Sequence, residues 1–428
     1  MNKRKRNKKR KMLLIVLILL LIVLSIVLVC RIEYKKAKEI EAIEFKQEQL
    51  KNKIESHYNE YVVTNKDTDI YELVNDEYTK IGKIKNQEEL TLEKIEITYK
   101  DEYFKISNFD GKYYVYYEDV DKIEELSNID TRYKRYIVFN QNIITKDITN
   151  FYDAEKKLIY TFPESYELPI IINKKDIYGV EFNNRLLYVM KDDVKEIKNS
   201  KNTTATNTNG VAVLNYHFFY DDALESERKD CDQIICHSKS GFQKQIDYIK
   251  NNNIFTLTMN EFEMYMDKQI NLPTSVLITI DDGWRMNLGI EMLNENKLNA
   301  TVFIITSWFE KITFLHSFGY IEYHSHGDRL HNQGECPGGQ GGAIKCWDRN
   351  KLLQDLSTSR KKLEGSTAFC YPFYEYNSYS ISVLKEAGFT LAFRGGFKKA
   401  TPQTDKYQIP RYVIYDYTTV DQLKKYIG

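Results

Sequence analysis

Residues 275–283 read SVLITIDDG, an apolar run that ends in two carboxylates and a glycine. An uncharged run of this length is typical of a strand buried on both faces, as in parallel sheets. Asp281 and Asp282 would then stand at the carboxyl end of the strand, where α/β folds build their sites. Two adjacent carboxylates repel each other unless a cation lies beside them, although an Asx turn that closes the strand is the alternative interpretation.

The sequence around this run alternates between strand-like and helical patterns. The strand-like runs are VAVLNY (211–216), TVFIIT (301–306) and TLAFR (390–394), and the helical patterns cover 241–251 and 350–363. Buried strands that alternate with amphipathic helices predict a parallel sheet, either open or closed into a barrel. We expect residues 211–428 to form one such domain.

A histidine cluster follows at residues 324–331, which read HSHGDRLH and hold three of the seven histidines. Two imidazoles and one carboxylate make a three-ligand site that leaves a fourth position to water, the usual arrangement for catalytic zinc. Core packing does not account for three histidines in a polar, glycine-containing stretch. A ligand pair of His324 and Asp328 is a chemical alternative within the same stretch.

These segments together resemble the NodB-type polysaccharide deacetylase family over residues 211–428. Its three motifs, T-F-D-D-G, S-H-T with a further His, and F-A-Y-P-Y/F in the poly-N-acetylglucosamine subgroup, correspond here to TIDDG (279–283), Ser325-His326 with His331, and FCYPF (369–373). The resemblance implies an α/β fold with a distorted (β/α)7-type barrel. It also implies hydrolytic N-deacetylation of N-acetylhexosamine units in peptidoglycan or poly-N-acetylglucosamine.

The resemblance implies a role for each matching residue. Asp282, His326 and His331 would hold a divalent metal, expected to be Zn²⁺, and Asp281 would act as general base. The oxyanion would be stabilised in part by a backbone N–H near Phe373. Tyr371, Phe373, Trp284 and Trp308 are candidates for aromatic walls against the sugar, with core packing as the alternative for each. His324 is expected either behind the metal ligands or as a ligand itself.

Two departures from the family pattern shift further roles to other residues. Many relatives use a late histidine as general acid, but none follows His331 here, so we expect His217 at the end of VAVLNY to serve; a structural histidine is the alternative. Many relatives also place a base-orienting arginine before the third motif, where this chain has Ser366-Thr367-Ala368. Arg411 or Arg394 can substitute, and Arg411 is the preferred candidate.

The N-terminus predicts a membrane anchor. Residues 12–30 are nineteen consecutive uncharged residues, nearly enough for a helix to span the roughly 30 Å hydrocarbon layer. Eight Lys and Arg in residues 1–11 predict a cytoplasmic N-terminus, which places the rest of the chain outside the cell. A cleaved signal peptide is the alternative, although no A-x-A site ends the run.

Residues 31–60 lack Pro and Gly and predict a helical stalk, and residues 61–197 look all-β. Within the β region, the segment beginning at Phe104 recurs at Tyr178 with matches at a constant offset of 74 residues. Each copy reads as a hairpin, with turns at 109–111 and 183–184. The pattern resembles bacterial SH3-like modules, which we place at 61–127 and 128–197, and the Asn/Thr-rich residues 198–210 form a linker.

Charge and cysteine content narrow the functional classes. Outside the basic N-terminus the chain has 53 basic and 61 acidic residues, a balance that argues against nucleic acid as a partner. The expected partners are an acetylated polysaccharide and the membrane, and no obligate protein partner is indicated. In an exported chain, two close cysteine pairs predict local disulfides, since neither spacing is that of a zinc knuckle: Cys231 with Cys236, and Cys336 with Cys346. An O-acetyl esterase and a wall-binding scaffold with an inactive barrel are the alternative functions.

Overall fold

The computed structural model describes residues 2–107, 111–126, 141–182, 185–200, 209–231, 233–310, 312 and 319–428. The chain divides into two compact units. One contains the N-terminal helix and the first β-strands, and the other contains the whole C-terminal α/β domain.

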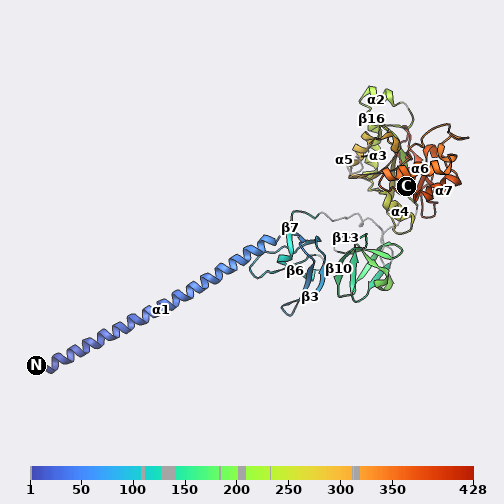
Figure 1. The fold of residues 1–428 in the computed structure, drawn as a ribbon. Helices are drawn as coiled ribbons and strands as arrows, with labels where there is room; N and C mark the ends of the chain where they lie inside the picture. The colour runs from blue at the N-terminus through green and yellow to red at the C-terminus, as the bar shows by residue number, and fades with distance from the viewer. Residues whose placement is uncertain are drawn as a thin grey trace. The chain divides into compact units, whose positions relative to one another are not determined.

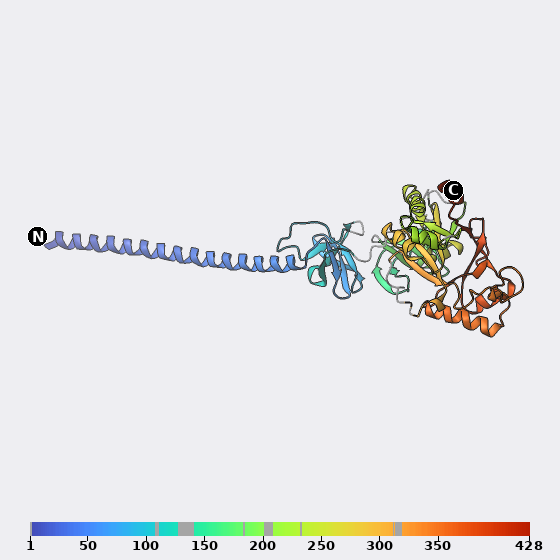
Figure 2. The same ribbon diagram turned by 90° about the horizontal axis from the view of Figure 1, so that it is seen from above.

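The N-terminal helix α1 (Asn2–His57) has 56 residues. Figures 1 and 2 show it as one uninterrupted helix. It is long and apolar enough to cross a membrane by length and composition. The predicted membrane segment and most of the predicted stalk therefore form a single helix, which ends three residues before the stalk's expected end. Its last turns pack on the adjoining β-structure, because Ile54 is fully buried and His57 Nδ1 lies 2.8 Å from the Val120 carbonyl oxygen.

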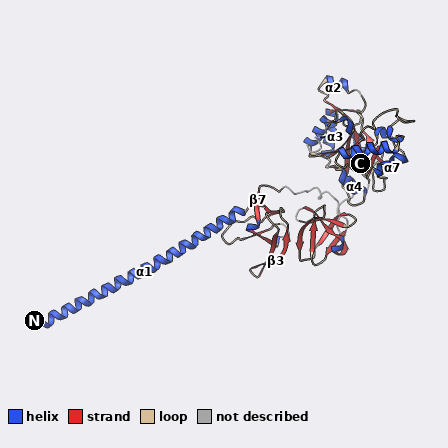
Figure 3. Ribbon diagram, viewed as in Figure 1, coloured by secondary structure: helices blue, strands red, loops and turns tan. Residues whose placement is uncertain are grey.

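Strands dominate the region that follows, which confirms the all-β prediction (Figure 3). The strands are β1 (Tyr61–Thr64), β2 (Thr68–Val74), β3 (Glu77–Ile84), β4 (Glu89–Thr91), β5 (Tyr103–Lys105), β6 (Tyr113–Tyr116), β7 (Val120–Ile123), β8 (Gln141–Thr145), β9 (Thr149–Tyr152), β10 (Leu158–Phe162), β11 (Glu167–Asn173), β12 (Ile177–Phe182), β13 (Arg185–Met190) and β14 (Val194–Asn199).

The internal repeat has the same local structure in both copies. Strand β6, the one-turn 3₁₀ helix η2 (Tyr117–Asp119) and β7 correspond at the 74-residue offset to β13, η4 (Lys191–Asp193) and β14. Pairing recurs as well: β1 pairs antiparallel with β4 and β7, and β8 pairs antiparallel with β11 and β14. The predicted turn residues 109–110 and 183–184, the module boundary at 127–128 and linker residues 201–208 lie outside the described residues. The assignment as two SH3-like modules stays a prediction.

The C-terminal domain alternates strands and helices. Its strands are β15 (Ala212–Tyr216), β16 (Phe218–Tyr220), β17 (Cys236–Ser238), β18 (Phe255–Thr256), β19 (Ser275–Asp282), β20 (Ala300–Ile304), β21 (Ile321–Ser325), β22 (Ala368–Cys370), β23 (Leu391–Gly396) and β24 (Ile409–Val413). Its helices are α2 (Glu225–Asp230), α3 (Lys239–Asn251), α4 (Met259–Met266), α5 (Asn287–Glu295), α6 (Arg349–Lys362), α7 (Ser378–Glu386) and α8 (Val420–Ile427).

Seven of these strands close into a parallel barrel. Strand β15 pairs with β24 on one side and with β19 on the other, which joins the two ends of the row β19 to β24. Strand β18 also pairs with β19 but is not one of the seven barrel strands. Strands β21 and β22 pair in register at one position, Ser325 with Phe369. The fold is therefore the predicted α/β barrel of (β/α)7 type, with its shortest strand pairing between β21 and β22.

Side chains alternate between the two faces of the barrel wall, as strand geometry requires. Leu214, Ile278 and Val302 belong to an apolar cluster that includes residues of helices α3, α5 and α8. Their neighbours in sequence face the barrel interior. All seven strands are parallel, so the last inward positions of every strand meet at one end of the barrel.

The strongest sequence signals correspond to observed elements, since the four predicted strands match β15, β19, β20 and β23. The two predicted helices match α3 and α6. Strands β21, β22 and β24 were not predicted. They are short or carry polar inward residues, which hides the apolar pattern of a buried strand.

Candidate active site

A cleft of about 410 Å³ opens at the carboxyl end of the barrel strands. Five polar side chains from five different strands gather there because they face the barrel interior at or near the carboxyl ends of those strands: His217, Asp281, His326, Cys370 and Arg411. The cleft is lined by His217, Phe218, Gln233, Ile235, Asp281, Asp282, Trp284, Trp308, His326, His331, Gln333, Tyr371, Phe373, Tyr374, Val413 and Tyr415.

Asp282, His326 and His331 bring three metal-ligand atoms within 4.8 Å of one another. Asp282 Oδ1 lies 3.2 Å from His326 Nε2 and 3.4 Å from His331 Nε2. The other ring nitrogen of His326, Nδ1, lies 2.8 Å from the Cys370 carbonyl oxygen, so Nε2 is left to face the cleft. Burial lowers the pKa of His331 to about 4, which keeps this imidazole neutral as a metal ligand must be.

The backbone at the end of β19 is bent to present Asp282. Asp282 has φ +72° and Gly283 has φ +93°, a region that side chains with Cβ rarely occupy. The positive φ favours the glycine of the TIDDG motif, and a Cβ there would lie 3.0 Å from Phe309 Cζ, so the ring would have to shift to admit it. A strained carboxylate at a strand end is a common feature of functional sites.

Asp281 is held by a buried arginine from β24, which is separated from β19 by the single strand β15. Arg411 on β24 donates from two guanidinium nitrogens to the two carboxylate oxygens of Asp281, each at 2.7 Å, and it also reaches Thr279 Oγ1 at 3.3 Å. Both partners are almost fully buried. Burial alone would raise the pKa of Asp281, but the Arg411 charge and hydrogen bonds hold it well below its usual range.

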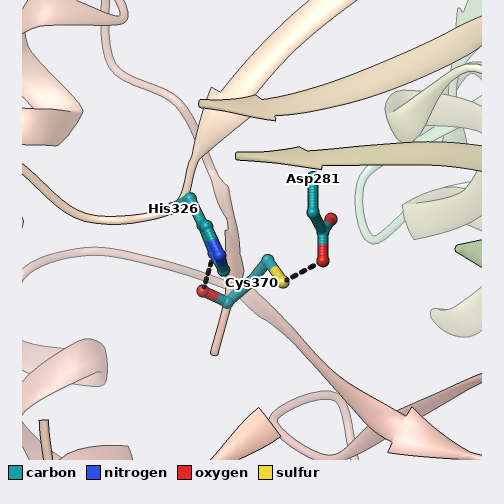
Figure 4. Close-up of side chains that lie close together, drawn as sticks. All are labelled: Asp281, His326 and Cys370. Atoms are coloured by element: carbon teal, nitrogen blue, oxygen red, sulfur yellow. Dashed lines mark hydrogen bonds between the residues drawn. The ribbon is translucent and has the colours of Figure 1, made fainter. Parts of the chain in front are cut away.

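Cys370 contacts both Asp281 and the metal-ligand candidate His326, as Figure 4 shows. Its thiol donates to Asp281 Oδ2 at 3.3 Å, its Sγ accepts from Arg411 at 2.8 Å, and its carbonyl oxygen lies beside His326 Nδ1. In the sequence, Cys370 stands out only as part of the third motif. Its contact with Asp281 could not be found from a pattern, because it depends on closure of the barrel.

His217 lies at the end of β15, in the wall of the cleft. It is buried, and its Nδ1 has no hydrogen-bond partner within the described part of the chain. Burial lowers the pKa of His217, while the nearby carboxylates of Asp281 and Asp282 act in the opposite direction. The side chain is therefore a neutral imidazole close to both aspartates.

Three residues considered as alternatives lie elsewhere. His324 points into the barrel two residues below His326, and its Nδ1 lies 2.8 Å from Ser366 Oγ. Asp328 accepts a hydrogen bond from Thr306 and pairs with Lys362. Arg394 donates to backbone carbonyl oxygens of Gln408 and Gly395. The geometry groups neither His324 with Asp328 nor Arg394 with Asp281.

Aromatic rings form the cleft walls. Trp284 is 43% exposed and packs edge-on against Phe218. Phe373 lies 4.4 Å from His331, ring centre to ring centre, and has a positive φ of 55°. Tyr371 is fully buried, with its hydroxyl donating to the Tyr407 carbonyl oxygen at 2.9 Å, so only part of its ring contributes to the wall.

Two disulfides close loops near these walls. Cys231 pairs with Cys236 in a small cluster with Phe218, and Cys336 pairs with Cys346. Glu375 accepts hydrogen bonds from two backbone N–H groups inside the second loop, at Gln340 and Gly342. This loop is thus tied to the segment that carries Phe373.

Tyr374 and Asn215 are further site residues that the sequence patterns did not reveal. The Tyr374 hydroxyl donates to Asn215 Oδ1 at 2.7 Å across the barrel mouth, and the ring lies over the Arg411 guanidinium. Asn215 is the inward residue before His217, so strand alternation would have predicted its direction. No spacing in the sequence links it to Tyr374.

Residues 268–392 match the family profile described as polysaccharide deacetylase. The C-terminal domain is therefore similar to the polysaccharide deacetylase family. The matched segment includes the three metal-ligand candidates, Asp281 and Cys370, whereas His217 and Arg411 lie outside it.

Curated proteins and a solved structure are similar to the C-terminal part of the chain. The chain is similar to poly-β-1,6-N-acetyl-D-glucosamine N-deacetylase of Staphylococcus aureus (strain MSSA476), with 27% identity over 263 residues that cover 55% of this chain and 87% of that protein. It is similar to the Staphylococcus epidermidis protein of the same name, with 24% identity over 215 residues that cover 44% and 71%. A solved structure of a de-N-acetylase from Aggregatibacter actinomycetemcomitans matches with 20% identity and a TM-score of 0.43, covering 50% of this chain and 99% of that one.

Proposed function

We propose that the C-terminal domain is a metal-dependent hydrolase that removes N-acetyl groups from N-acetylhexosamine units of a cell-wall or surface polysaccharide. The observation that carries this proposal is the Asp282, His326 and His331 donor group beside the arginine-held Asp281 in an open cleft. The similarity to the deacetylase family and the activity named for the staphylococcal relatives support it.

The donor group fits a divalent cation, and Zn²⁺ is the expected ion. Two imidazole nitrogens and one carboxylate oxygen leave an open position, as catalytic zinc requires. The contact of His326 Nδ1 with a backbone carbonyl supplies the outer hydrogen bond that usually orients a ligating histidine. When bound, the cation would lower the pKa of a coordinated water and polarise the acetamide carbonyl.

Asp281 is the proposed base and Arg411 its positioning partner. The two 2.7 Å hydrogen bonds fix the carboxylate plane and keep Asp281 ionised, so it is ready to accept a proton from the attacking water. The backbone N–H at Phe373 is the proposed donor to the oxyanion that develops on the acetyl oxygen.

His217 is the proposed proton donor to the amine leaving group. Its lowered pKa makes it neutral in the resting protein, so it must first gain a proton within the site before it can deliver one. The two neighbouring carboxylates favour that charged form, and its Nδ1 has no partner in the described structure to compete.

We further propose that α1 anchors the enzyme in the cell membrane, with the N-terminus cytoplasmic and the catalytic domain extracellular. The helix length and composition and the basic residues 1–11 support this placement. A tethered enzyme would act on polymer at the cell surface. The β-modules would act as spacers or as wall-binding units.

The test measures metal content and acetate release for the full chain in detergent. Asp282→Asn and His331→Ala are expected to lose both the metal and the release of acetate from poly-β-1,6-N-acetylglucosamine oligomers. His324→Ala is the matched control, because this histidine lies close by in sequence but contacts Ser366. Wild-type protein that binds no divalent metal, or a His324→Ala variant that loses metal as completely as His331→Ala, would contradict the proposal.

A further inference from the structure

A second hollow of about 330 Å³ adjoins the cleft. It is lined by Ile305, Ser307, Trp308, Arg329, His331 and Asn332, and it shares Trp308 and His331 with the cleft. Each hollow has the size of a small-molecule site, which is about 300–1,000 Å³. A ligand larger than one sugar can therefore extend from one to the other past the same two side chains.

The turn that carries Trp308 is fixed relative to the metal ligands. The 3₁₀ helix η5 (Thr306–Trp308) follows β20, and Thr306 binds Asp328 through its hydroxyl at 2.6 Å. The Thr306 and Ser307 N–H groups donate to carbonyl oxygens of Gly327 and Asp328, within the loop between His326 and His331. Trp308 lies edge-on to His331, with ring centres 6.1 Å apart.

The chemistry of this hollow suits a hexosamine ring. Trp308 is 53% exposed, so its indole offers a broad apolar face to solvent beside the site. Arg329, Asn332 and Ser307 provide hydrogen-bond donors and acceptors around that face. The Arg329 guanidinium lies 3.6 Å from the Asp328 carboxylate, so it is available as a donor to sugar hydroxyl groups at the edge of the hollow.

We propose that this hollow is a subsite for the sugar next to the one being deacetylated, with Trp308 as its stacking platform. This inference rests on the proposed function, because the occupant is the neighbouring unit of the same polymer. A polymer whose acetylated unit sits at Asp282 must continue beyond the cleft, and the wall shared through Trp308 and His331 provides that path. Trp308 then acts as a specificity residue for chain length.

The test compares kcat/KM over a series of N-acetylglucosamine oligomers from one to six units, using the full chain in detergent. Trp308→Ala is expected to lower the ratio of hexamer to monomer kcat/KM about tenfold, which corresponds to about 1.4 kcal/mol of binding. Asn332→Ala, on another wall of the hollow, should lower the ratio in the same direction. Phe397→Ala removes an aromatic ring that is 67% exposed and lines neither hollow, so it should leave the ratio unchanged.

Two results would overturn the subsite: an unchanged ratio in Trp308→Ala, or an equal loss at every length, which would mean that Trp308 acts only through His331. Failure of the proposed function would look different, because wild-type protein would then release no acetate from any oligomer. In that case the affinity of the protein for the hexamer, measured by calorimetry, tests whether the subsite exists. Equal affinity for wild type and Trp308→Ala would refute it, and a loss of about tenfold would support it.

Discussion

Replacement of Arg411 by Met should destabilise the barrel by about 3 kcal/mol. Removing one partner of a buried ion pair costs roughly 3–5 kcal/mol, since the other charge is left without compensation. Asp281 would keep the thiol of Cys370 as a side-chain donor, but a thiol is a weak donor and carries no charge to replace the guanidinium. The lower end of the range applies because Arg411 Nε has no partner within the described structure, so its removal relieves a buried unsatisfied group.

A double-mutant cycle isolates the pair itself. Asp281→Asn together with Arg411→Met removes both charges, and such replacements are often nearly neutral. We therefore expect the double variant to be more stable than the sum of the single losses by at least about 2 kcal/mol. Arg394→Met is the matched control, because Arg394 lies on the adjacent strand and donates to backbone carbonyls.

Intrinsic tryptophan fluorescence can follow this domain within the full chain. All three tryptophans, Trp284, Trp308 and Trp347, belong to the C-terminal domain. For a domain of this size, 3 kcal/mol corresponds to a decrease in Tm of about 6–12 °C. An Arg411→Met variant that melts with wild type, or a double variant whose loss equals the sum of the single losses, would refute the role of this pair.

Other parts of the domain offer three more tests. Burial lowers the pKa of His237 to about 3, so the stability of the wild-type protein should fall as pH drops below about 6.5. His237→Phe should remove about 2 kcal/mol of that loss at pH 5, and the variant should therefore show a smaller decrease in Tm between neutral pH and pH 5. Glu375→Gln should weaken its hydrogen bonds to the disulfide-closed loop and speed amide hydrogen exchange in residues 336–346; unchanged exchange would contradict this. Gly283→Ala should cost at least about 1–2 kcal/mol and displace Asp282, so a metal titration should show weaker binding.

The fold can be predicted from the sequence where side-chain pattern and burial agree. Residues 275–280 carry no charge on either face and are mostly apolar, so the strand is evident and the position of Asp281 at its end follows. Strand β21 could not be recognised in this way, because Glu322 and His324 occupy its inward positions and give the segment the composition of a polar loop. Strand β22 has only three residues, too few for any periodicity.

Residue patterns alone reveal the chemistry of the site only where its residues are neighbours in sequence, and the predictions for His217 and Arg411 rest on the family resemblance. Asp281 with Asp282, and His326 with His331, lie in two short motifs, so their chemistry is visible in the sequence alone. Arg411 is 130 residues from Asp281, and no sequence pattern gives a geometric reason to prefer it over Arg394. The reason lies in alternation on neighbouring strands: Arg411 pairs in register with Gly395, so both face inward, and Arg394 faces the other way. In a barrel of this kind, the inward face of each strand therefore has to be assigned first, and a distant partner for a buried carboxylate chosen only among the inward residues.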